Sequence, residues 1–380
     1  MKVLIVGGGP VGLAAAIRAR LRGMEAIVFD RQRPPIDKAC GEGLMPGGVQ
    51  ALRDLGVQIP QAHAFGGIRY FQEDHPHEAV AEGRFSHGGG FGIRRLALHE
   101  SLVKRAEEVG VDLRWETHVT RLEPNALHTD TERIHGDWIV GADGLHSPIR
   151  KWAGLERKHK KPQRYGLRRH YAIAPWSDCV EVYWTRGCEA YVTPTSPESV
   201  GVAILWHQNQ HQPKRDHPIS PFPRLQERIA TADFLSIPRG AGPLRREVTR
   251  VQKDRLLLVG DAAGYVDALT GEGLALGFRQ AEAAISAIEN NQPNRYRSAH
   301  RALCRRPFFL TKTLRWIAAH PGIRRRVIRG LAKDPVLFSR FLDLMEGEAG
   351  WSQLGLLRTT RLLGGLAFPT RTSPTASPSK

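Results

Sequence analysis

The sequence VLIVGGGPVGLAAAIRARLRGMEAIVFD, residues 3–30, determines the fold that we predict for this chain. Residues 3–6 form an apolar, β-branched run that is typical of a buried parallel strand. A glycine-rich turn and a helical pattern follow, and a second apolar run at residues 26–29 ends in Asp30. Strand, turn, helix, strand and acid within about 30 residues are the pattern of a dinucleotide-binding unit.

The glycines of this pattern have separate roles in the predicted site. Gly7 permits the tight turn, Gly9 lets the backbone approach a pyrophosphate, and Gly12 lets the helix pack close to the strand. The helix N-terminus would offer free N–H groups and a partial positive charge to the phosphates. Asp30 can accept hydrogen bonds from both hydroxyls of a ribose, and we place Arg31 beside it. A glycine-rich turn that binds no nucleotide is the alternative.

Two later segments each join a buried apolar strand to an acidic residue. Residues 137–144 (DWIVGADG) contain Asp143, and residues 255–264 (RLLLVGDAAG) contain Asp261. A helix is predicted to begin shortly after the second segment. Residues at its start would again present backbone N–H groups to an anionic or electron-rich ligand. The candidates among them are Gly271, Gly273 and Leu274.

Together these segments resemble the flavoprotein superfamily of p-hydroxybenzoate-hydroxylase-type monooxygenases and geranylgeranyl reductases. The first is similar to its dinucleotide fingerprint, the second to its D-G-x-x-S-x-x-R motif and the third to its Gly-Asp motif. Residues 93–98 (IRRLAL) resemble a V-x-R-x-x-L segment in which the arginine matching Arg95 approaches FAD. The resemblance also implies that backbone near Val119 meets the adenine. It runs from residue 3 to about residue 290 and implies that FAD is the cofactor.

The pattern and the resemblance imply an α/β fold with three parts. These are a Rossmann-like FAD-binding domain of the glutathione-reductase type, an inserted antiparallel β-sheet domain for the substrate, and C-terminal helices. Short apolar runs separated by turn signals place the inserted sheet at residues 163–206. Tyr191 and Thr193 are candidates to face the substrate pocket, and ordinary sheet positions are the alternative.

We predict the following domain boundaries. The FAD-binding domain comprises residues 1–68, 93–162 and 245–294. The substrate sheet comprises residues 69–92 and 163–244. A basic helical subdomain covers residues 295–368, and a disordered tail covers residues 369–380.

Departures from the hydroxylase pattern bear on the reaction. Gly264 and Ala268 stand where typical hydroxylases have a histidine and a proline. Residues 40–44 (CGEGL) and 269–273 (LTGEG) are more similar to the geranylgeranyl-reductase branch, in which the first segment lies near the flavin. The prediction is therefore an FAD-dependent oxidoreductase with two open alternatives. A monooxygenase that hydroxylates a hydrophobic or aromatic small molecule is placed first, and a reductase of C=C bonds in an isoprenoid or polyketide second.

Other features limit the partners. The chain has no second dinucleotide motif, so NAD(P)H is expected to dock transiently as the electron donor, or another protein supplies the electrons. The four cysteines form no C-x-x-C pair, and the histidines of residues 207–217 lack regular ligand spacing, so we predict no metal. A non-catalytic escort protein of the same fold is a further alternative, although such relatives typically lose the nucleotide motifs that are intact here.

Charge is concentrated near the C-terminus. The chain has 55 Lys and Arg against 38 Asp and Glu, a formal net charge of +17, and residues 295–340 contribute 13 basic residues and one acid. Pro307, Pro321 and Pro335 are predicted to divide this stretch into short helices. A solvated helical face and a surface that contacts an anionic membrane stay open as interpretations. No nucleic acid is expected, because no binding module accompanies the charge.

The expected location is cytoplasmic, with the membrane surface as a second place of action. The scattered cysteines fit a reducing compartment. No stretch of 18 apolar residues predicts a spanning helix.

Overall fold

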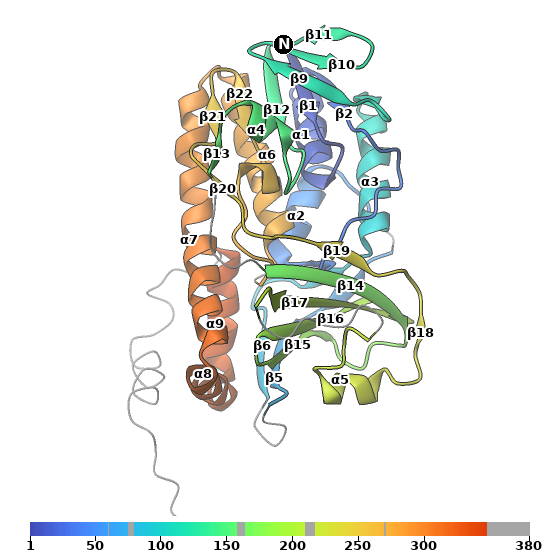
Figure 1. Cartoon of the computed structure of the whole chain (residues 1–380), viewed down its shortest axis with the longest axis vertical. Coiled ribbons are helices and arrows are strands. Elements are labelled where there is room, and N and C mark those ends of the chain that lie inside the picture. The colour runs from blue at the N-terminus through green and yellow to red at the C-terminus, as the bar shows by residue number, and fades with distance from the viewer. Residues whose placement is uncertain (60, 75–79, 158–163, 210–216, 270, 348–380) are drawn as a thin grey trace, which may run out of the picture.

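Two large β-sheets organise the part of the chain that the computed structural model describes, residues 1–59, 61–74, 80–157, 164–209, 217–269 and 271–347. A six-stranded sheet lies among helices in the upper half of Figure 1, and an eight-stranded sheet fills the lower half. The helix α7 (Pro293–Ala319) runs along both. The predicted α/β fold with C-terminal helices is confirmed.

The six-stranded sheet has the strand order β21-β22-β12-β1-β2-β8, and all its neighbours are parallel except the pair β21 and β22. Its apolar strands are buried on both faces, as parallel strands covered by helices are. Helix α1 packs against both α3 and α6. The bounds are β1 Lys2–Val6, β2 Glu25–Phe29, β8 Asp112–Arg114, β12 Trp138–Gly141, β21 Gln252–Lys253, β22 Leu256–Leu258, α1 Pro10–Leu21, α3 Arg95–Glu108 and α6 Gly273–Glu289.

The eight-stranded sheet is antiparallel except where β5 and β15 pair in parallel. Side chains alternate between its faces. On one face, side chains such as Tyr183 form an apolar cluster with Phe222 and with residues of helix α5 (Pro223–Arg228). The other face turns toward the six-stranded sheet and the C-terminal helices. The strands are β5 Gly67–Gln72, β6 Ala81–Arg84, β14 Arg164–Ala172, β15 Cys179–Thr185, β16 Cys188–Ser196, β17 Ser199–His207, β18 Asp233–Phe234 and β19 Arg239–Ala241.

Three smaller sheets and several short helices complete the described part of the chain. Strands β3, β4 and β7 form one small sheet, β9, β10 and β11 a second, and β13 and β20 a third. Their bounds, with those of the short helices, are β3 Gly43–Leu44, β4 His63–Phe65, β7 Gly90–Gly92, β9 Val119–Glu123, β10 Ala126–Thr129, β11 Arg133–His135, β13 Glu156–Arg157, β20 Glu247–Val248, α2 Pro46–Asp54, α4 Pro148–Trp152 and η1 Gly260–Ala263.

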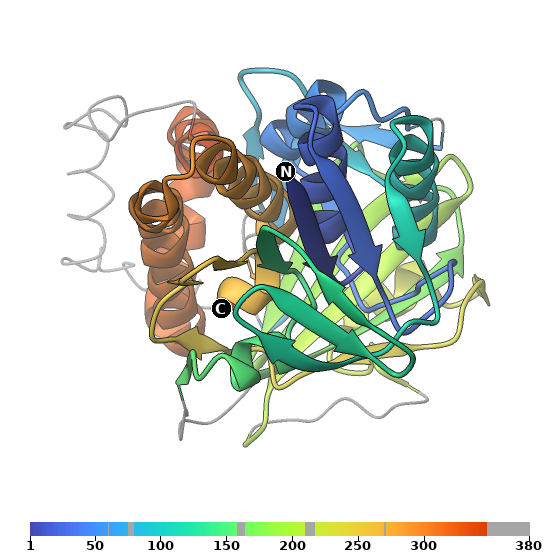
Figure 2. The same cartoon turned by 90° about the horizontal axis from the view of Figure 1, so that it is seen from above.

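The C-terminal helices stand on one side of the molecule (Figure 2). Pro321 and Pro335 begin α8 (Pro321–Lys333) and α9 (Pro335–Glu346), as predicted. The prediction was wrong at Pro307, because α7 continues through it. A proline inside a helix removes one hydrogen bond and costs roughly 3 kcal/mol or more. Pro307 is buried, and α7 packs along α6, so tertiary packing offsets that cost.

Several predictions fall on residues that the structure does not describe. These include the tail at 369–380, the end of the basic subdomain beyond residue 347, and most of the polar loop after His207. In the described ranges, no helix combines the length and the apolar character needed to cross a membrane.

Candidate functional site

Four of the residues predicted to bind the cofactor meet at one edge of the six-stranded sheet. Strands β1, β2, β12 and β22 are parallel neighbours, so their carboxyl ends share that edge. Gly7 follows β1, Asp30 follows β2, Asp143 comes shortly after β12, and Asp261 comes shortly after β22. Ligands of open α/β sheets bind outside the carboxyl ends of the strands, so this edge is the candidate site.

The glycine loop after β1 is closely packed on one side and open on the other. A Cβ on Gly12 would lie 1.9 Å from the carbonyl oxygen of Gly7, and Gly7 itself has φ +109°. A Cβ on Gly9 would have only one neighbour within 4 Å, the Nη2 atom of Arg95 at 3.8 Å. Helix α1 begins directly after Gly9, and its first N–H groups have no acceptor within the helix. This open cradle with free donors fits a pyrophosphate.

Asp30 supports the loop from the end of β2. Its Oδ2 accepts a hydrogen bond from the Gly8 N–H at 2.8 Å, and its Oδ1 accepts one from the Gln32 N–H at 2.9 Å. Each carboxylate oxygen has a further lone pair for a ribose hydroxyl. Arg31 is exposed beside it. Val119 begins β9 close by, since the N–H of Thr117 donates to the Asp30 carbonyl at 3.0 Å.

Arg95 lies between the glycine loop and the Cys40–Leu44 segment. It is buried at the first position of α3, and its backbone N–H donates to Oε1 of Glu42 at 2.9 Å. Glu42 has φ +60°, which a residue other than glycine rarely adopts, and its side chain is only 4% exposed. Burial also raises the pKa of the neighbouring Cys40 thiol, so this cysteine stays protonated.

A polar network that the sequence did not predict joins this segment to β14. Nε2 of His170 lies 2.5 Å from Oε2 of Glu42, and both side chains are buried. Nη1 of Arg168 lies 3.2 Å from Nδ1 of His170. A guanidinium only donates, so Nδ1 accepts and the ring proton sits on Nε2, where it donates to Glu42. Arg168 also pairs with Asp37.

The Gly-Asp motif, with Asp261, also lies near Arg95. Surrounding protein raises the pKa of Asp261 by burial, while Lys38 and Arg95 oppose the shift. Nη1 of Arg150 donates to the carbonyl oxygen of Asp261 at 3.3 Å. The buried Arg150 therefore holds the Asp261 turn against the segment that follows β12.

The start of α6 is open. A Cβ on Gly271 would meet nothing within 4 Å, and one on Gly273 would meet only Tyr265, at 3.8 Å. Leu274 follows at the second position of the helix, and the N-cap is Glu272. The N–H groups of Gly273 and Leu274, at the first two positions of this 17-residue helix, have no acceptor within the helix, whereas the N–H of Gly271 donates to the carbonyl oxygen of Ala268 at 3.3 Å. Asp143 has a supporting contact, since its Oδ2 accepts a hydrogen bond from the N–H of Ile149 at 3.0 Å.

Tyr191 and Thr193 lie on the face of β16 that turns toward these segments. The Thr193 hydroxyl donates to the carbonyl oxygen of Gly41 at 2.9 Å. The Tyr191 hydroxyl lies 3.3 Å from the carbonyl oxygen of Leu269 and 3.3 Å from Oε2 of Glu189. The two candidates therefore contact the two reductase-like segments that the sequence singled out.

A buried charge cluster, also absent from the sequence predictions, ties the loop before α6 to α7. Arg164 donates to Oε2 of Glu189 at 2.7 Å and to Oδ1 of Asp267 at 3.1 Å. Nε of Arg315, from α7, lies 3.2 Å from Oδ2 of Asp267. Two cations and two carboxylates thus balance one another at the meeting point of sheet, loop and helix.

The signals for these two networks are faint in the sequence. Arg164, Arg168 and His170 alternate along an otherwise ordinary strand, which puts them on one face. Charged residues on a buried face need partners of opposite charge. The repeat of Arg164, Arg168 and His170 on one face was therefore the signal from which these networks could have been predicted. In the part of the chain that the structure describes, no group of three or more His, Cys, Asp or Glu residues could hold a metal ion.

Comparisons with known proteins agree with this geometry. A family model described as "FAD binding domain" matches residues 1–290. The chain is 28% identical over 302 residues to the dialkyldecalin synthase of Streptomyces rugosporus, covering 73% of this chain and 63% of that protein. It is 24% identical over 315 residues to the digeranylgeranylglycerophospholipid reductase of Methanosarcina mazei, covering 75% of each chain.

A solved structure shares the whole fold. The flavoprotein/dehydrogenase of Cytophaga hutchinsonii superimposes with a TM-score of 0.80 and 17% identity, covering 97% of this chain and 99% of that chain. At this identity the likeness concerns the fold. The same arrangement of two sheets and C-terminal helices therefore occurs in a protein whose sequence has diverged widely.

Proposed function

Because the chain belongs to the FAD binding domain family and is an FAD-dependent oxidoreductase, we propose that it reduces C=C bonds in a hydrophobic, isoprenoid-like small molecule. The contact between Glu42 and His170 carries this proposal. It builds the Cys40–Leu44 segment, which is similar to the reductase branch, into the junction of the two sheets. The relative from Methanosarcina mazei, whose name describes a lipid reductase, supports the same direction.

The backbone at Gly264 supports this choice over hydroxylation. Typical hydroxylases carry a histidine at the matching position. Here the residue has φ +118° and ψ 150°, a region that side-chain-bearing residues rarely adopt. Replacing Gly264 by histidine would strain the turn after Asp261. The loop is therefore shaped for glycine, and we infer that its departure from the hydroxylase motif is structural.

We assign the FAD-binding roles as follows. Free N–H groups at the start of α1 would hold the pyrophosphate, Asp30 the ribose, and the start of α6 the electron-rich end of the flavin. FAD, when bound, supplies hydride transfer, and the protein supplies geometry and water exclusion. The residues that we propose to contact it are Gly7, Gly9, Gly12, Asp30, Arg31, Arg95, Val119, Asp143, Asp261, Gly271, Gly273 and Leu274.

The division of labour between the parts follows from this assignment. We propose that residues 1–68, 93–162 and 245–294 hold FAD and that residues 69–92 and 163–244 present the substrate. Tyr191 and Thr193 would line the substrate side. NAD(P)H is the proposed transient electron donor. We further propose a cytoplasmic protein that contacts an anionic membrane surface, where a lipophilic substrate resides.

The test reduces the holoprotein without oxygen, using NADPH, NADH or dithionite, and follows the flavin absorbance. A reductase is reoxidised by an unsaturated isoprenoid while oxygen stays absent. A monooxygenase stays reduced with the same compound until oxygen enters, and that result would replace our proposal by hydroxylation of a hydrophobic or aromatic molecule. A saturated isoprenoid of the same length is the matched control, and it should leave the flavin reduced in either case.

A further inference from the structure

The helix α7 has two chemically different sides. Its inner side is buried and includes Tyr296, Cys304 and Leu310. Arg315 also points inward, because its Nε lies 3.2 Å from Asp267. The helix carries seven Lys and Arg residues and no Asp or Glu over its 27 residues. Its charge is therefore not balanced within the helix.

An exposed row of five residues, which we name the α7 stripe, runs along the outer side. Its members follow one another at spacings of four, four, three and four residues, so they lie on one face of the helix. They are Arg301, Arg305, Phe309, Lys312 and Trp316. Phe309 is 56% exposed and Trp316 is 53% exposed, which is unusual for large aromatic side chains. The stripe thus combines three cations with two projecting aromatic rings.

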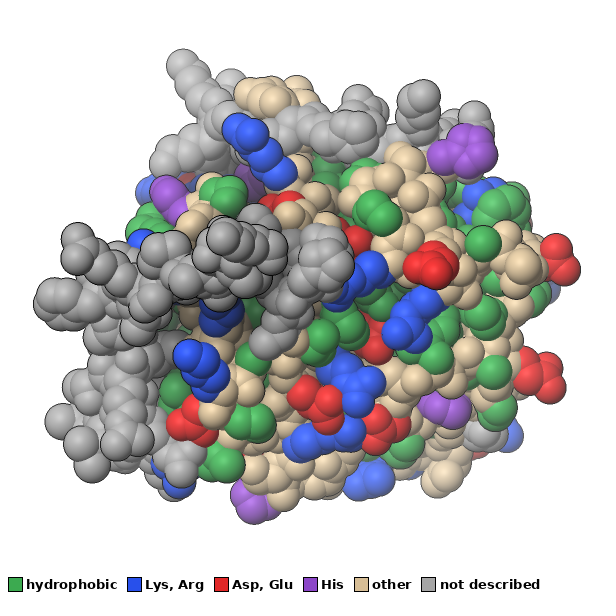
Figure 3. Space-filling view, turned by 90° about the horizontal axis from the view of Figure 1, so that it is seen from below, with side chains coloured by type: hydrophobic (Ala, Val, Ile, Leu, Met, Phe, Trp, Pro, Cys, Tyr) green, Lys and Arg blue, Asp and Glu red, His purple; other side chains and the backbone are tan. Residues whose placement is uncertain are grey.

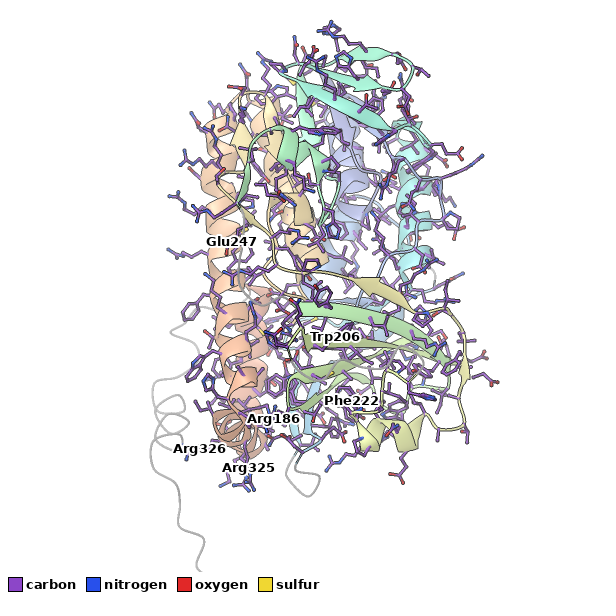
Figure 4. The ribbon with its side chains drawn as sticks, viewed as in Figure 1. Arg186, Trp206, Phe222, Glu247, Arg325 and Arg326 are labelled. Atoms are coloured by element: carbon purple, nitrogen blue, oxygen red, sulfur yellow. The ribbon has the colours of Figure 1, made fainter. Side chains whose placement is uncertain are left out.

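The adjoining helix extends the same chemistry. Helix α8 carries five Lys and Arg residues and no acid. One of them, Arg324, is buried and pairs with Asp74, whereas Arg326, Arg329 and Lys333 are exposed. Figure 4 shows Arg325 and Arg326 at the lower end of the helices. Helix α8 thus has one basic residue that is buried in an ion pair and three that are exposed at the surface.

The underside of the molecule is different. In Figure 3, acidic and basic side chains are interspersed over the face seen from below. Such mixing is what ion pairs like Arg69–Glu82 and Arg84–Asp178 produce at the edge of the eight-stranded sheet. A surface that mixes positive and negative charges has little net attraction for a charged plane, whereas a surface with charges of one sign attracts a plane of opposite charge.

A small hollow lies between the inner side of α7 and residues of the candidate FAD site. It is lined by Pro307, Phe308 and Thr311 of α7, and on the opposite side by residues such as Asp261 and Gly273. Phe308 is adjacent in sequence to Phe309 of the stripe. The stripe and the cofactor-facing hollow therefore lie on two sides of a single helix.

We propose that the α7 stripe is a docking surface for an anionic lipid bilayer. Phe309 and Trp316 enter the boundary between headgroups and acyl chains, while Arg301, Arg305 and Lys312 contact anionic headgroups. The hollow on the inner side of α7 then lies one helix diameter, about 10 Å, from the bilayer surface. This inference rests on the proposed function, because the bilayer would be the place where the enzyme meets its lipophilic substrate. Vesicle binding itself requires no turnover, so it can be measured without the reaction.

The test measures binding of the FAD-loaded full chain to sedimenting vesicles of phosphatidylglycerol and phosphatidylcholine, without substrate or reductant. Wild-type protein should bind at low salt and dissociate as salt rises, because screening weakens surface charge interactions. Each cation near an anionic membrane contributes about 1 kcal/mol, so R301Q/R305Q/K312Q should weaken binding roughly a hundredfold. The matched control R53Q/R121Q/R250Q removes three exposed arginines elsewhere and should bind nearly as the wild type does.

The aromatic half of the stripe has its own control. F309S/W316S should reduce binding to the mixed vesicles, whereas W152S/I237S, which alters two exposed apolar residues elsewhere, should not. Three results would overturn the inference: no wild-type binding at low salt, equal loss in stripe and control variants, or binding to duplex DNA in place of vesicles. Vesicle binding without reductase activity would contradict the proposed reaction alone. Activity without vesicle binding would contradict this inference and the proposed membrane contact, and would leave the proposed reaction standing.

Discussion

Oε2 of Glu42 lies 2.5 Å from Nε2 of His170, across the boundary between the two sheets. The other oxygen of the same carboxylate accepts the backbone N–H of Arg95, which the glycine loop approaches. One buried side chain therefore fixes the first residue of α3 and a residue of β14 at the same time. We expect the position of Arg95 toward FAD to depend on this carboxylate.

Glu42→Gln should destabilise the protein by about 1–3 kcal/mol, because an NH2 group that cannot accept would replace one of the two accepting oxygens, and either the Nε2 proton of His170 or the Arg95 N–H would become a buried donor without an acceptor. Glu100 on α3 is exposed, so Glu100→Gln is the matched control and should change stability by less than about 0.5 kcal/mol. Urea unfolding measures both. Equal stabilities of the two variants would show that the contact contributes nothing.

Two glycines separated by three positions should respond differently to alanine. Gly12→Ala places a Cβ 1.9 Å from the carbonyl oxygen of Gly7, so the variant should be strongly destabilised or fail to fold. Gly9→Ala meets only Arg95, at 3.8 Å, and should fold normally while it loses FAD affinity. Circular dichroism and flavin titration separate the effects. A Gly9→Ala protein with unchanged FAD affinity would refute the assigned pyrophosphate site.

Asp30→Ala should lower FAD affinity by at least about tenfold, since each hydrogen bond to a charged group contributes about 1.5–3 kcal/mol. Asp30 also holds Gly8 and Gln32 through their backbone N–H groups, so a moderate loss of stability should accompany the effect. Fluorescence titration with FAD measures the affinity. Asp130→Ala removes an exposed carboxylate and should retain wild-type affinity. Matching affinities of the two variants would exclude Asp30 from the ribose site.

Stability should decrease below neutral pH through His300. Burial lowers the pKa of its imidazole from 6.5 to about 4. Between these values the unfolded chain binds a proton that the folded chain does not, so the free energy of unfolding falls as pH falls, by about 1 kcal/mol per pH unit. His300→Gln should reduce this slope without abolishing it, because burial also lowers the pKa of His207 to about 4, whereas the exposed His87→Gln should keep the full slope. Urea unfolding from pH 7 to pH 5 distinguishes them, and parallel slopes in all three proteins would be the contrary result.

Local patterns were enough to predict the elements at the carboxyl edge of the six-stranded sheet. Gly7 and Asp30 each follow an apolar run directly, and Asp261 follows one after the single residue Gly260. Adjacent parallel strands bring such positions together. The contact of Glu42 with His170 could not be predicted in this way, because 128 residues separate them and it depends on how the two sheets pack. Pro307 shows the converse, since packing along α6 overrides a local helix-breaking signal.

The mass of the product tests the central claim most directly. Holoprotein that has been reduced without oxygen is mixed with an unsaturated isoprenoid in anionic vesicles. The molecular mass of the extracted lipid is then measured by mass spectrometry. The proposal predicts a gain of two hydrogen atoms for each reduced double bond, with no need for oxygen. A product that gains one oxygen atom, and forms only after oxygen is admitted, would contradict it.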